Sequence, residues 1–245
     1  MTITILTLFP QVFTDIFSSS ILNRAQKKGL VKINLVDIRD FATDKHKSVD
    51  DAPYGGGPGM IMRVDILEKA IAFSKIKNQK SKIKERIILL DPAGKRFNQA
   101  KAREYAKLDH LILVCGHYEG VDVRISHFVD ESISIGEYVL TGGEIPAMVI
   151  ADSVIRLIPQ VLTKKEATIK ESYSVGHLLE APQYTRPRVY KGYKVPAVLT
   201  SGNHQKIENW QDRQSILRSK ILTETNFSCR QAPSQPRQYP QREQS

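Results

Sequence analysis

The chain has 245 residues, of which 41% are hydrophobic, enough to fold around a core of its own. With 36 Lys and Arg against 26 Asp and Glu, its net charge is +10. This excess favours either a polyanionic partner such as nucleic acid or a basic surface without one. The sequence contains no run of about 18 apolar residues, so no membrane-spanning helix is predicted. Residues 1–10 resemble a strand more than a signal peptide. Cys115 and Cys229 lie far apart, so neither a disulfide framework nor a zinc knuckle is indicated, and we expect a reduced, cytoplasmic protein without membrane contact.

The first third of the chain predicts a strand–helix–strand unit followed by a loop and a helix. In chain order we expect a strand at 2–8, a helix from Pro10 to Lys28, a strand at 31–37, a long loop at 40–59 and a helix at 63–74. Gly29 stands where a helix cap is expected. Residues 75–84 contain five lysines and no acid, which favours a solvated surface loop over a phosphate-binding patch.

The middle of the chain alternates strand and helix patterns. We expect strands at 86–90, 110–114 and 130–135, and helices at 98–107, 121–128 and 146–158. Each strand is a short apolar run, typical of strands buried on both faces, so the alternation predicts an α/β domain with a mostly parallel sheet. The last helix is apolar nearly all round, and we expect it to be buried.

Beyond Pro159 the pattern changes. We expect no clear strand there, an amphipathic helix at 203–222 and a disordered tail at 226–245. Residues 1–159 contain 22 Lys and Arg and 19 acids, whereas the remainder contains 14 and 7. Net charges of +3 and +7 place most of the basic excess in the second part, as expected if that part holds nucleic acid.

Three glycine-rich loops are candidate ligand sites. The first, residues 55–59, matches neither a P-loop nor a dinucleotide-binding loop, and is either a close backbone approach to a ligand or a flexible turn. The second, residues 116–120, follows the strand at 110–114, and the third, residues 136–146, follows the strand at 130–135. Because open α/β sheets bind ligands at the carboxyl ends of their strands, these two loops predict a shared small-ligand pocket.

Acid–base candidates are few. Glu171 lies among lysines in a polar loop, where a solvated carboxylate is the simplest interpretation. Arg156 lies in an apolar helix and must be paired or face a cavity, which leaves a structural ion pair and a functional cation equally open. The histidines show neither metal-ligand spacing nor a Ser-His-Asp pattern, which disfavours metal-dependent hydrolysis and nucleophilic catalysis.

Six segments carry longer motifs. They are DDAPYGGGPGM at 50–60, CGHYEGVD at 115–122, SIGEYVLTGGEIP at 134–146, RLIP at 156–159, YTRP at 184–187 and SGNH at 201–204. With these motifs, in this order, the chain resembles the bacterial tRNA (guanine-N1)-methyltransferases, which modify guanosine 37 beside the anticodon. The resemblance runs from Ile3 to about Arg218.

The resemblance implies an α/β fold with a deep trefoil knot, followed by a small α-helical C-terminal domain. General folding rules alone would predict an open sheet without a knot. By this resemblance, residues 1–160 form the knotted domain that binds S-adenosylmethionine, 161–172 a linker, 173–225 a helical tRNA-binding domain and 226–245 a tail. It also implies a homodimer whose active site spans both subunits.

The resemblance also assigns residues to the site. Glu171 would be the general base, and Arg156 would stabilise charge on the guanine. The cofactor-binding residues would be Leu89, Leu90, Gly116, Tyr118, Glu119, Gly120, Ser134, Ile135, Gly136, Glu137, Tyr138, Val139, Leu140, Gly142, Gly143 and Pro146. The tRNA contacts would be Pro58, Gly59, Ser172, Arg186 and His204. No residue is expected to bind a metal, although the resemblance makes Mg²⁺ a candidate cofactor.

These assignments suit the chemistry of guanine. N1 carries a proton and is a poor nucleophile, so a base must remove that proton as the methyl group arrives, and a cation beside O6 would stabilise the negative charge. The family has aspartate at the base position, whereas Glu171 has an extra methylene that moves the carboxylate by about 1 Å. The run from Gly176 to Glu180 is also one residue longer than in the family. A loop rebuilt to suit the longer side chain is one interpretation of the two changes.

Two alternative functions stay open. The first is a non-catalytic tRNA-binding paralogue whose base is disabled by the change to Glu171, and the intact cofactor loops disfavour it. The second is a related knotted methyltransferase acting on a ribose hydroxyl or another base. The YGGGPG and YTRP motifs disfavour this second alternative, because they resemble one family.

Overall fold

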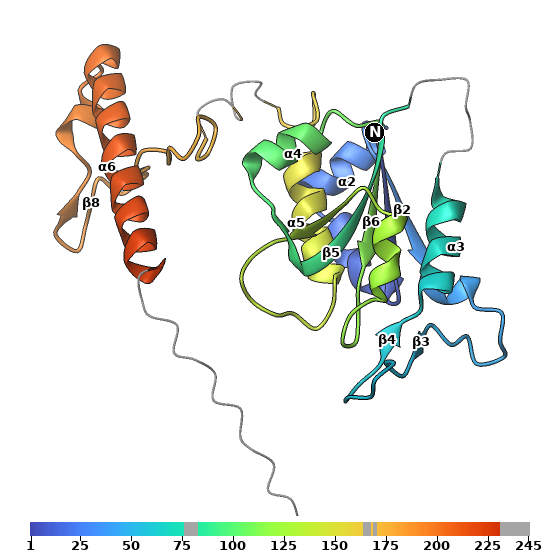
Figure 1. Cartoon of the computed structure of the whole chain (residues 1–245). Helices are drawn as coiled ribbons and strands as arrows, with labels where there is room; N and C mark the ends of the chain where they lie inside the picture. The colour runs from blue at the N-terminus through green and yellow to red at the C-terminus, as the bar shows by residue number, and fades with distance from the viewer. Residues whose placement is uncertain (76–82, 164–167, 169–170, 231–245) are drawn as a thin grey trace, which may run out of the picture. The chain divides into compact units, whose positions relative to one another are not determined.

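The computed structural model describes residues 1–75, 83–163, 168 and 171–230, with side chains up to residue 221. The chain forms two compact units, Met1–Lys165 and Glu166–Ser245. In chain order the first unit contains β1 (Thr2–Thr7), η1 (Pro10–Phe13), α1 (Thr14–Phe17), α2 (Ser20–Lys27), β2 (Lys32–Asp37), η2 (Ile38–Phe41), β3 (Asp50–Asp51), β4 (Ile61–Met62), α3 (Val64–Ser74), β5 (Glu85–Arg96), α4 (Gln99–Tyr105), β6 (His110–Cys115), η3 (Val123–His127), β7 (Glu131–Ser134) and α5 (Glu144–Ile155), where η marks a 3₁₀ helix (Figure 1).

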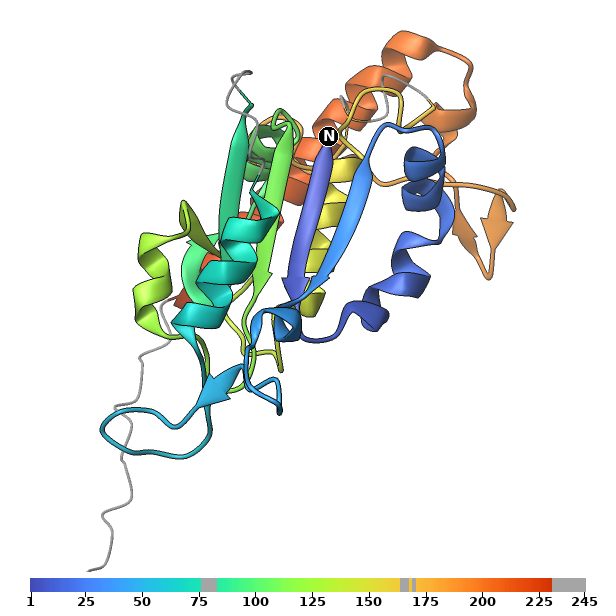
Figure 2. The same cartoon turned by 90° about the vertical axis from the view of Figure 1, so that its right-hand side faces the viewer.

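The first unit is built on a five-stranded sheet in the order β2-β1-β6-β5-β7 (Figure 2). Every neighbouring pair in this sheet is parallel, which confirms the expected α/β class and mostly parallel sheet. The central strand β6 is buried along its whole length because both faces of the sheet are covered. Leu111 and Leu113 of β6 point into one core, and Ile112 and Val114 point into the other.

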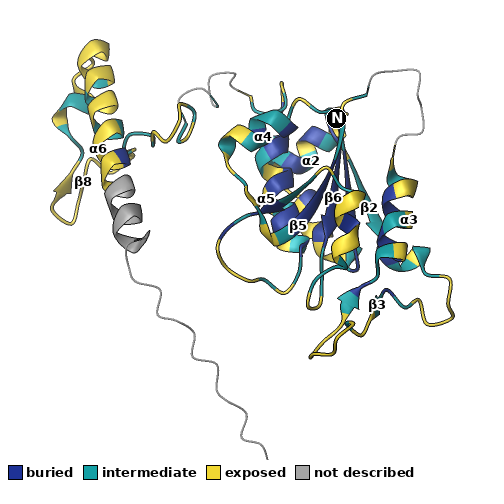
Figure 3. Cartoon of the chain, viewed as in Figure 1, coloured by how far each residue is buried: buried dark blue, intermediate teal, exposed yellow. Residues whose placement is uncertain are grey.

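Helices cover both faces of the sheet, with α2, α4 and α5 on one side and α3 on the other (Figure 1). Figure 3 shows the burial concentrated in β5, β6 and α5. Phe13 and Ile150 belong to the core under α5, whereas Ile66, Leu67 and Ile125 form the core under α3. This layering leaves the carboxyl ends of the central strands open at one edge.

Three of the expected helices differ from the structure. The helix expected at 121–128 is the short 3₁₀ helix η3. The helix expected from Pro10 to Lys28 is three short pieces, because the hydroxyl groups of Ser18 and Ser19 both bond the carbonyl oxygen of Asp15 and compete with the helical pattern. The helix expected at 146–158 is α5, which starts earlier and is not buried all round. The Gly29 cap is confirmed, since Gly29 has a φ of 69° directly after α2.

The strand expected at 86–90 is the longer β5, which continues to Arg96 through a break in register between Leu90 and Lys95. The break holds the turn sequence Asp91-Pro-Ala-Gly94, with Oδ1 of Asp91 accepting a hydrogen bond of 2.7 Å from the Ala93 amide. The bulge points the chain after Leu90 out of the sheet plane, at the edge where ligands of such sheets bind.

The second unit contains β8 (Val189–Tyr190), β9 (Tyr193–Lys194), η5 (Ala197–Thr200) and α6 (His204–Arg230). The expectation of no strand beyond Pro159 is therefore wrong, because β8 and β9 form an antiparallel hairpin too short to show a period in the sequence. Helix α6 includes residues 226–230, which were expected in the tail. Most of the lysine-rich run at 75–84, much of the expected linker and the rest of the tail lie outside the described residues.

Contacts to α6 organise the part of the second unit that precedes the hairpin. The hydroxyl of Ser215 donates to the Leu179 carbonyl over 2.5 Å, and Nη1 of Arg218 donates to the Glu180 carbonyl over 2.6 Å. The rings of Tyr184 and Trp210 lie 6.3 Å apart. No helix in the described part of either unit combines the length and apolarity needed to cross a membrane.

Candidate active site

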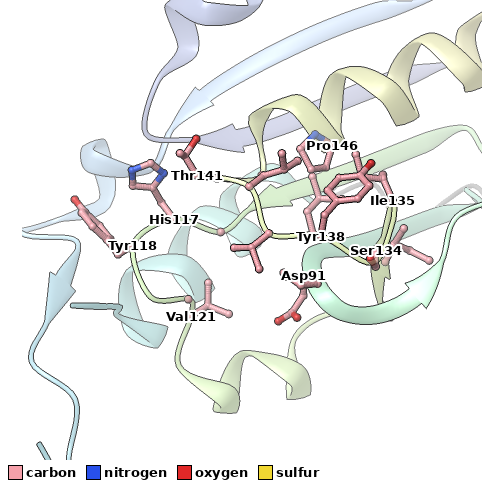
Figure 4. Close-up of a pocket in the computed structure, with 18 of the residues that line it drawn as sticks. Asp91, His117, Tyr118, Val121, Ser134, Ile135, Tyr138, Thr141 and Pro146 are labelled. Atoms are coloured by element: carbon pink, nitrogen blue, oxygen red, sulfur yellow. The ribbon is translucent and has the colours of Figure 1, made fainter. Parts of the chain in front are cut away.

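The candidate site is a pocket at the carboxyl ends of β5, β6 and β7, where three loops of the first unit converge (Figure 4). β5 contributes its bulge, β6 contributes the loop at 116–121, and β7 contributes the segment that leads into α5. Glycine and apolar residues dominate its lining, a composition typical of small-ligand pockets. The two glycine-rich loops selected from the sequence therefore share one pocket.

At Gly142 and Gly143, two loops of the pocket approach each other too closely for side chains. The amide of Gly143 donates a hydrogen bond of 2.8 Å to the carbonyl of Gly116. A Cβ added to Gly143 would lie 2.6 Å from Cα of Cys115, and one added to Gly142 would lie 2.7 Å from Nδ1 of His117. Only glycine fits this approach, which leaves peptide groups at the pocket surface.

Polar side chains gather beneath these glycines. The hydroxyl of Thr7, at the end of β1, donates a hydrogen bond of 2.7 Å to the Glu144 carboxylate at the start of α5. Burial, and secondarily the negative charge of Glu144, raises the pKa of the Cys115 thiol, so this cysteine stays protonated. Nδ1 of His117 is buried and has no hydrogen-bond partner within the described residues. It is a buried polar atom of a residue that lines the pocket.

The first glycine-rich loop, between β3 and β4, adjoins the rim of the pocket. The amide of Glu119 donates to the Met60 carbonyl over 3.1 Å, and the amide of Met62 donates to the Gly120 carbonyl over 3.0 Å. A Cβ on Gly59 would collide with the Glu119 side chain. The exposed residues Pro58 and Gly59 therefore lie beside the loop that follows β6.

Arg156 caps the carboxyl end of α5, the end farther from the pocket, and is partly buried. Pro146, in the first turn of the same helix, lines the pocket. A rise of 1.5 Å per residue places Arg156 about 15 Å further along the axis. Within one chain, Arg156 does not line this pocket.

Glu171 belongs to the second unit and is partly buried in a turn. Its carbonyl accepts a hydrogen bond of 3.0 Å from the Ser174 amide, and its side chain lines a hollow shared with Ser215 of α6. The hydroxyl of Ser172 accepts a hydrogen bond of 3.0 Å from the Glu180 amide, so this expected tRNA contact also holds its own loop together. A carboxylate is chemically able to accept a proton, and these bonds hold the backbone of the turn that carries it.

The other expected tRNA contacts in the second unit are exposed side chains. Arg186 precedes the hairpin, and His204 is the first residue of α6. Asn203 caps that helix, since its Oδ1 accepts a hydrogen bond of 3.0 Å from the Lys206 amide. Both contacts are therefore carried by ordered backbone and remain accessible to a partner.

Comparison with known proteins decides the family. A family model described as tRNA (Guanine-1)-methyltransferase TrmD matches residues 1–224. The chain belongs to this family. Proteins named tRNA (guanine-N(1)-)-methyltransferase are similar to it throughout this methyltransferase region. The protein from Bacillus pumilus (strain SAFR-032) is 53% identical over 220 residues, covering 89% of this chain and 88% of the relative. The protein from Bacillus subtilis (strain 168) is 51% identical over 222 residues, covering 90% of each. The family resemblance carried by the six motifs is confirmed.

In this member of the methyltransferase family, the structure brings most of the expected cofactor-binding residues together. Those that line the pocket are Leu90, Gly116, Tyr118, Glu119, Gly120, Ser134, Ile135, Gly136, Tyr138, Val139, Leu140, Gly142, Gly143 and Pro146. Two expected residues lie elsewhere. Leu89, only 4% exposed, points into the core under α3, because alternate residues of β5 face opposite sides. Glu137 pairs with Arg96, with 3.1 Å between Oε1 and Nη1.

His117 and Thr141 also line the pocket and lie in the two loops selected from the sequence, although the residue list from the resemblance omits them. Sequence reasoning missed four lining residues: Asp91, Pro92, Val121 and Ile133. Asp91 and Pro92 follow the carboxyl end of a buried strand run, the same signal that selected the other two loops, and could have been found by it. Among the residues whose positions the structure gives, no group of three or more His, Cys, Asp or Glu side chains is placed to hold a metal ion.

Proposed function

We propose that this chain transfers the methyl group of S-adenosylmethionine to N1 of guanosine 37 in tRNA. The observation that carries the proposal is the glycine-rich pocket at the carboxyl ends of β5, β6 and β7, in a chain whose family match spans residues 1–224. The relatives' names specify the substrate class and the reacting nitrogen. Position 37 comes from the motif resemblance and is the part that the assay below tests.

The pocket residues fit S-adenosylmethionine. Peptide groups of residues 116–120 and 134–143 offer donors and acceptors for the edge of an adenine ring, and Tyr138 and Leu140 offer apolar surface for its faces. The unpartnered Nδ1 of His117 supports the same assignment, because a buried ring nitrogen needs a polar partner. The bound cofactor supplies a methyl group carried on a sulfonium.

Two side chains act on the guanine in this proposal. The Glu171 carboxylate accepts the N1 proton, so that the ring nitrogen gains the electron pair it needs to bond the methyl carbon. The Arg156 guanidinium lies beside O6 and stabilises the negative charge that develops on the ring. Glutamate and aspartate have similar unperturbed pKa values, so Glu171 supplies the chemistry of the family aspartate with a longer reach.

The same proposal includes a homodimer with a composite active site. The position of Arg156, about 15 Å along α5 from the pocket of its own chain, supports an arrangement in which this arginine serves the pocket of another chain. The exposed apolar surface of α5 supports this arrangement, because Ile145 and Val149 are 53% and 40% exposed on a helix expected to be buried. Val12 and Ile16, in the neighbouring segment, are also exposed. Apolar surface of this kind marks contact sites between chains.

The same proposal includes the deep trefoil knot and separate roles for the two units, with the cofactor bound by the first and tRNA by the second. The segment between β7 and α5 is bonded at one end to Phe97, whose amide donates to the Ser134 carbonyl, and at the other end to Gly116 through the Gly143 amide. A chain held between two loops in this way supports the threading that the family fold implies.

We assign the pocket to a domain of residues 1–160, and tRNA binding to residues 173–225 together with Pro58 and Gly59. Mg²⁺ stays a candidate cofactor, tested by chelation in the assay below.

A paired methylation assay tests the proposal. Unmodified tRNA with guanosine at position 37 and the same tRNA with adenosine there are each incubated with enzyme and S-adenosylmethionine carrying a labelled methyl group. We expect label at N1 of the guanosine-37 tRNA and none in its adenosine counterpart. Glu171→Asp, run beside the wild type, measures what the longer side chain contributes. The same assay with a chelator and with added Mg²⁺ reports metal dependence.

Each other outcome assigns a different function. Equal labelling of both tRNAs would contradict the site assignment and favour a methyltransferase with another target atom. Salt-dependent tRNA binding without any methyl transfer would favour the non-catalytic paralogue.

A further inference from the structure

The β8–β9 hairpin of the second unit is a short, well-formed surface element. Its strands pair Val189 with Lys194 and Tyr190 with Tyr193. The two loop residues both have positive φ, 47° at Lys191 and 86° at Gly192, the backbone of a tight two-residue turn. The Val195 amide extends the ladder by donating to the Arg188 carbonyl over 3.0 Å.

One face of the hairpin presents a pair of tyrosine rings. Residues directly opposite in an antiparallel pair project to the same face, with Cβ atoms about 5 Å apart, so Tyr190 and Tyr193 lie side by side. They are 61% and 82% exposed, in the exposed part of the unit shown in Figure 3. Two adjacent aromatic side chains held outside any core mark a binding surface.

The charge around these rings is uniformly positive. Nζ of Lys191 lies 5.5 Å from the centre of the Tyr190 ring, and Lys194, which pairs with Val189, adds a positive charge on the opposite face of the hairpin. Residues 181–207 contain no Asp or Glu. Arg188 has a different role, because its Nη2 donates a hydrogen bond of 2.7 Å to the hydroxyl of Thr200 and ties the base of the hairpin to η5. Two tyrosine rings and Lys191 are thus presented on a scaffold that the unit itself stabilises.

We propose that this hairpin face, Tyr190 and Tyr193 with the turn residue Lys191, binds an unpaired segment of the tRNA. The tyrosine rings stack on its bases, and Lys191 contacts a flanking phosphate. This inference rests on the proposed function, which supplies tRNA as the ligand. Adjacent rings with a cation beside them match the alternation of base and phosphate along a nucleotide strand, and the absence of Asp and Glu from residues 181–207 suits a polyanion.

The test compares the double variants Tyr190→Ala/Tyr193→Ala and Tyr190→Phe/Tyr193→Phe in the full chain, with unmodified tRNA as the probe. The alanine pair should raise the Kd for tRNA about tenfold or more, and the phenylalanine pair should keep it near the wild-type value, because stacking needs the ring but not the hydroxyl. In methylation kinetics the loss should appear in KM rather than kcat, since stacking holds the substrate equally before and during reaction. Lys191→Gln should reduce the slope of log Kd against log salt concentration by about 1, the contribution of one phosphate contact.

Val189→Ala is the matched control, because Val189 lies on the opposite face of the same hairpin and should leave tRNA binding unchanged. Circular dichroism and thermal unfolding of each variant confirm folding. Wild-type Kd and KM in the folded alanine pair would overturn the proposal. A change of oligomeric state with unchanged tRNA affinity would also overturn it and assign the face to a contact between chains. Failure of the proposed function would appear separately, as absence of methyl transfer by the wild-type chain.

Discussion

The two compact units differ in what their candidate sites are made of. In the first unit, glycine-rich loops and apolar side chains at the edge of a buried parallel sheet form the pocket. In the second unit, the candidate groups are side chains on short turns, a hairpin and the start of a helix, with Glu171 partly buried and Arg186 and His204 exposed. In the glycine-rich pocket, activity should be lost when a side chain is added where only glycine fits. In the second unit, activity should be lost when a functional side chain is removed. Substitutions in the two units should therefore reduce activity for different reasons.

The largest effect should come from Glu171→Gln, which removes the proton acceptor and changes little else in its turn. We expect kcat to fall by about 10²- to 10⁴-fold, the contribution typical of a general base. Affinity for S-adenosylmethionine, measured by calorimetry, should stay near the wild-type value, because the pocket belongs to the first unit. Glu171→Asp keeps a carboxylate and should retain part of the activity. A wild-type kcat in Glu171→Gln would place the base elsewhere and remove the distinction between the units.

The next effect should come from Gly143→Ala, with Gly116→Ala as its matched control in the same pocket. A methyl group on Gly143 would lie 2.6 Å from Cα of Cys115, which is backbone and must move. A displacement of about 1 Å in a tuned site costs about 100-fold in kcat/KM, and overpacking costs about 1–3 kcal/mol of stability. On Gly116 the same methyl group meets no atom closer than 3.5 Å. Cofactor titration and thermal unfolding of both variants check the prediction, and equal losses in the two would contradict it.

The same difference between the units explains how far sequence reasoning reached. Buried strands such as 110–114 are continuous apolar runs, so the sheet and the loops at its carboxyl edge were predictable. The β8–β9 hairpin was not, because two-residue strands joined by Lys191-Gly192 show no period and carry no Asn-Gly signal. The sequence marked Arg156 as a candidate because it is a charged residue in an apolar helix. Its separation from the pocket became clear only from the structure, where the start of α5 lines the pocket and Arg156 stands at the other end of the helix. The bulge at Asp91 was missed because a turn sequence inside a strand looks like the end of that strand.

The smallest effect should come from Ser219→Ala, which tests how firmly side chains hold the turn that carries Glu171. The buried hydroxyl of Ser219 accepts a hydrogen bond of 2.8 Å from the Leu179 amide and donates one of 2.7 Å to the Ser215 carbonyl. Its loss leaves the Leu179 amide without that partner, at a cost of about 1–2 kcal/mol. Hydrogen exchange at Leu179 should accelerate, and kcat should fall several-fold while cofactor affinity is kept, because Glu171 is then held less firmly. Ser201→Ala is the control, since Ser201 makes a similar pair of bonds at an exposed position and should cost less. Equal losses of unfolding free energy in the two variants would mean that burial adds nothing to the contribution of these hydrogen bonds.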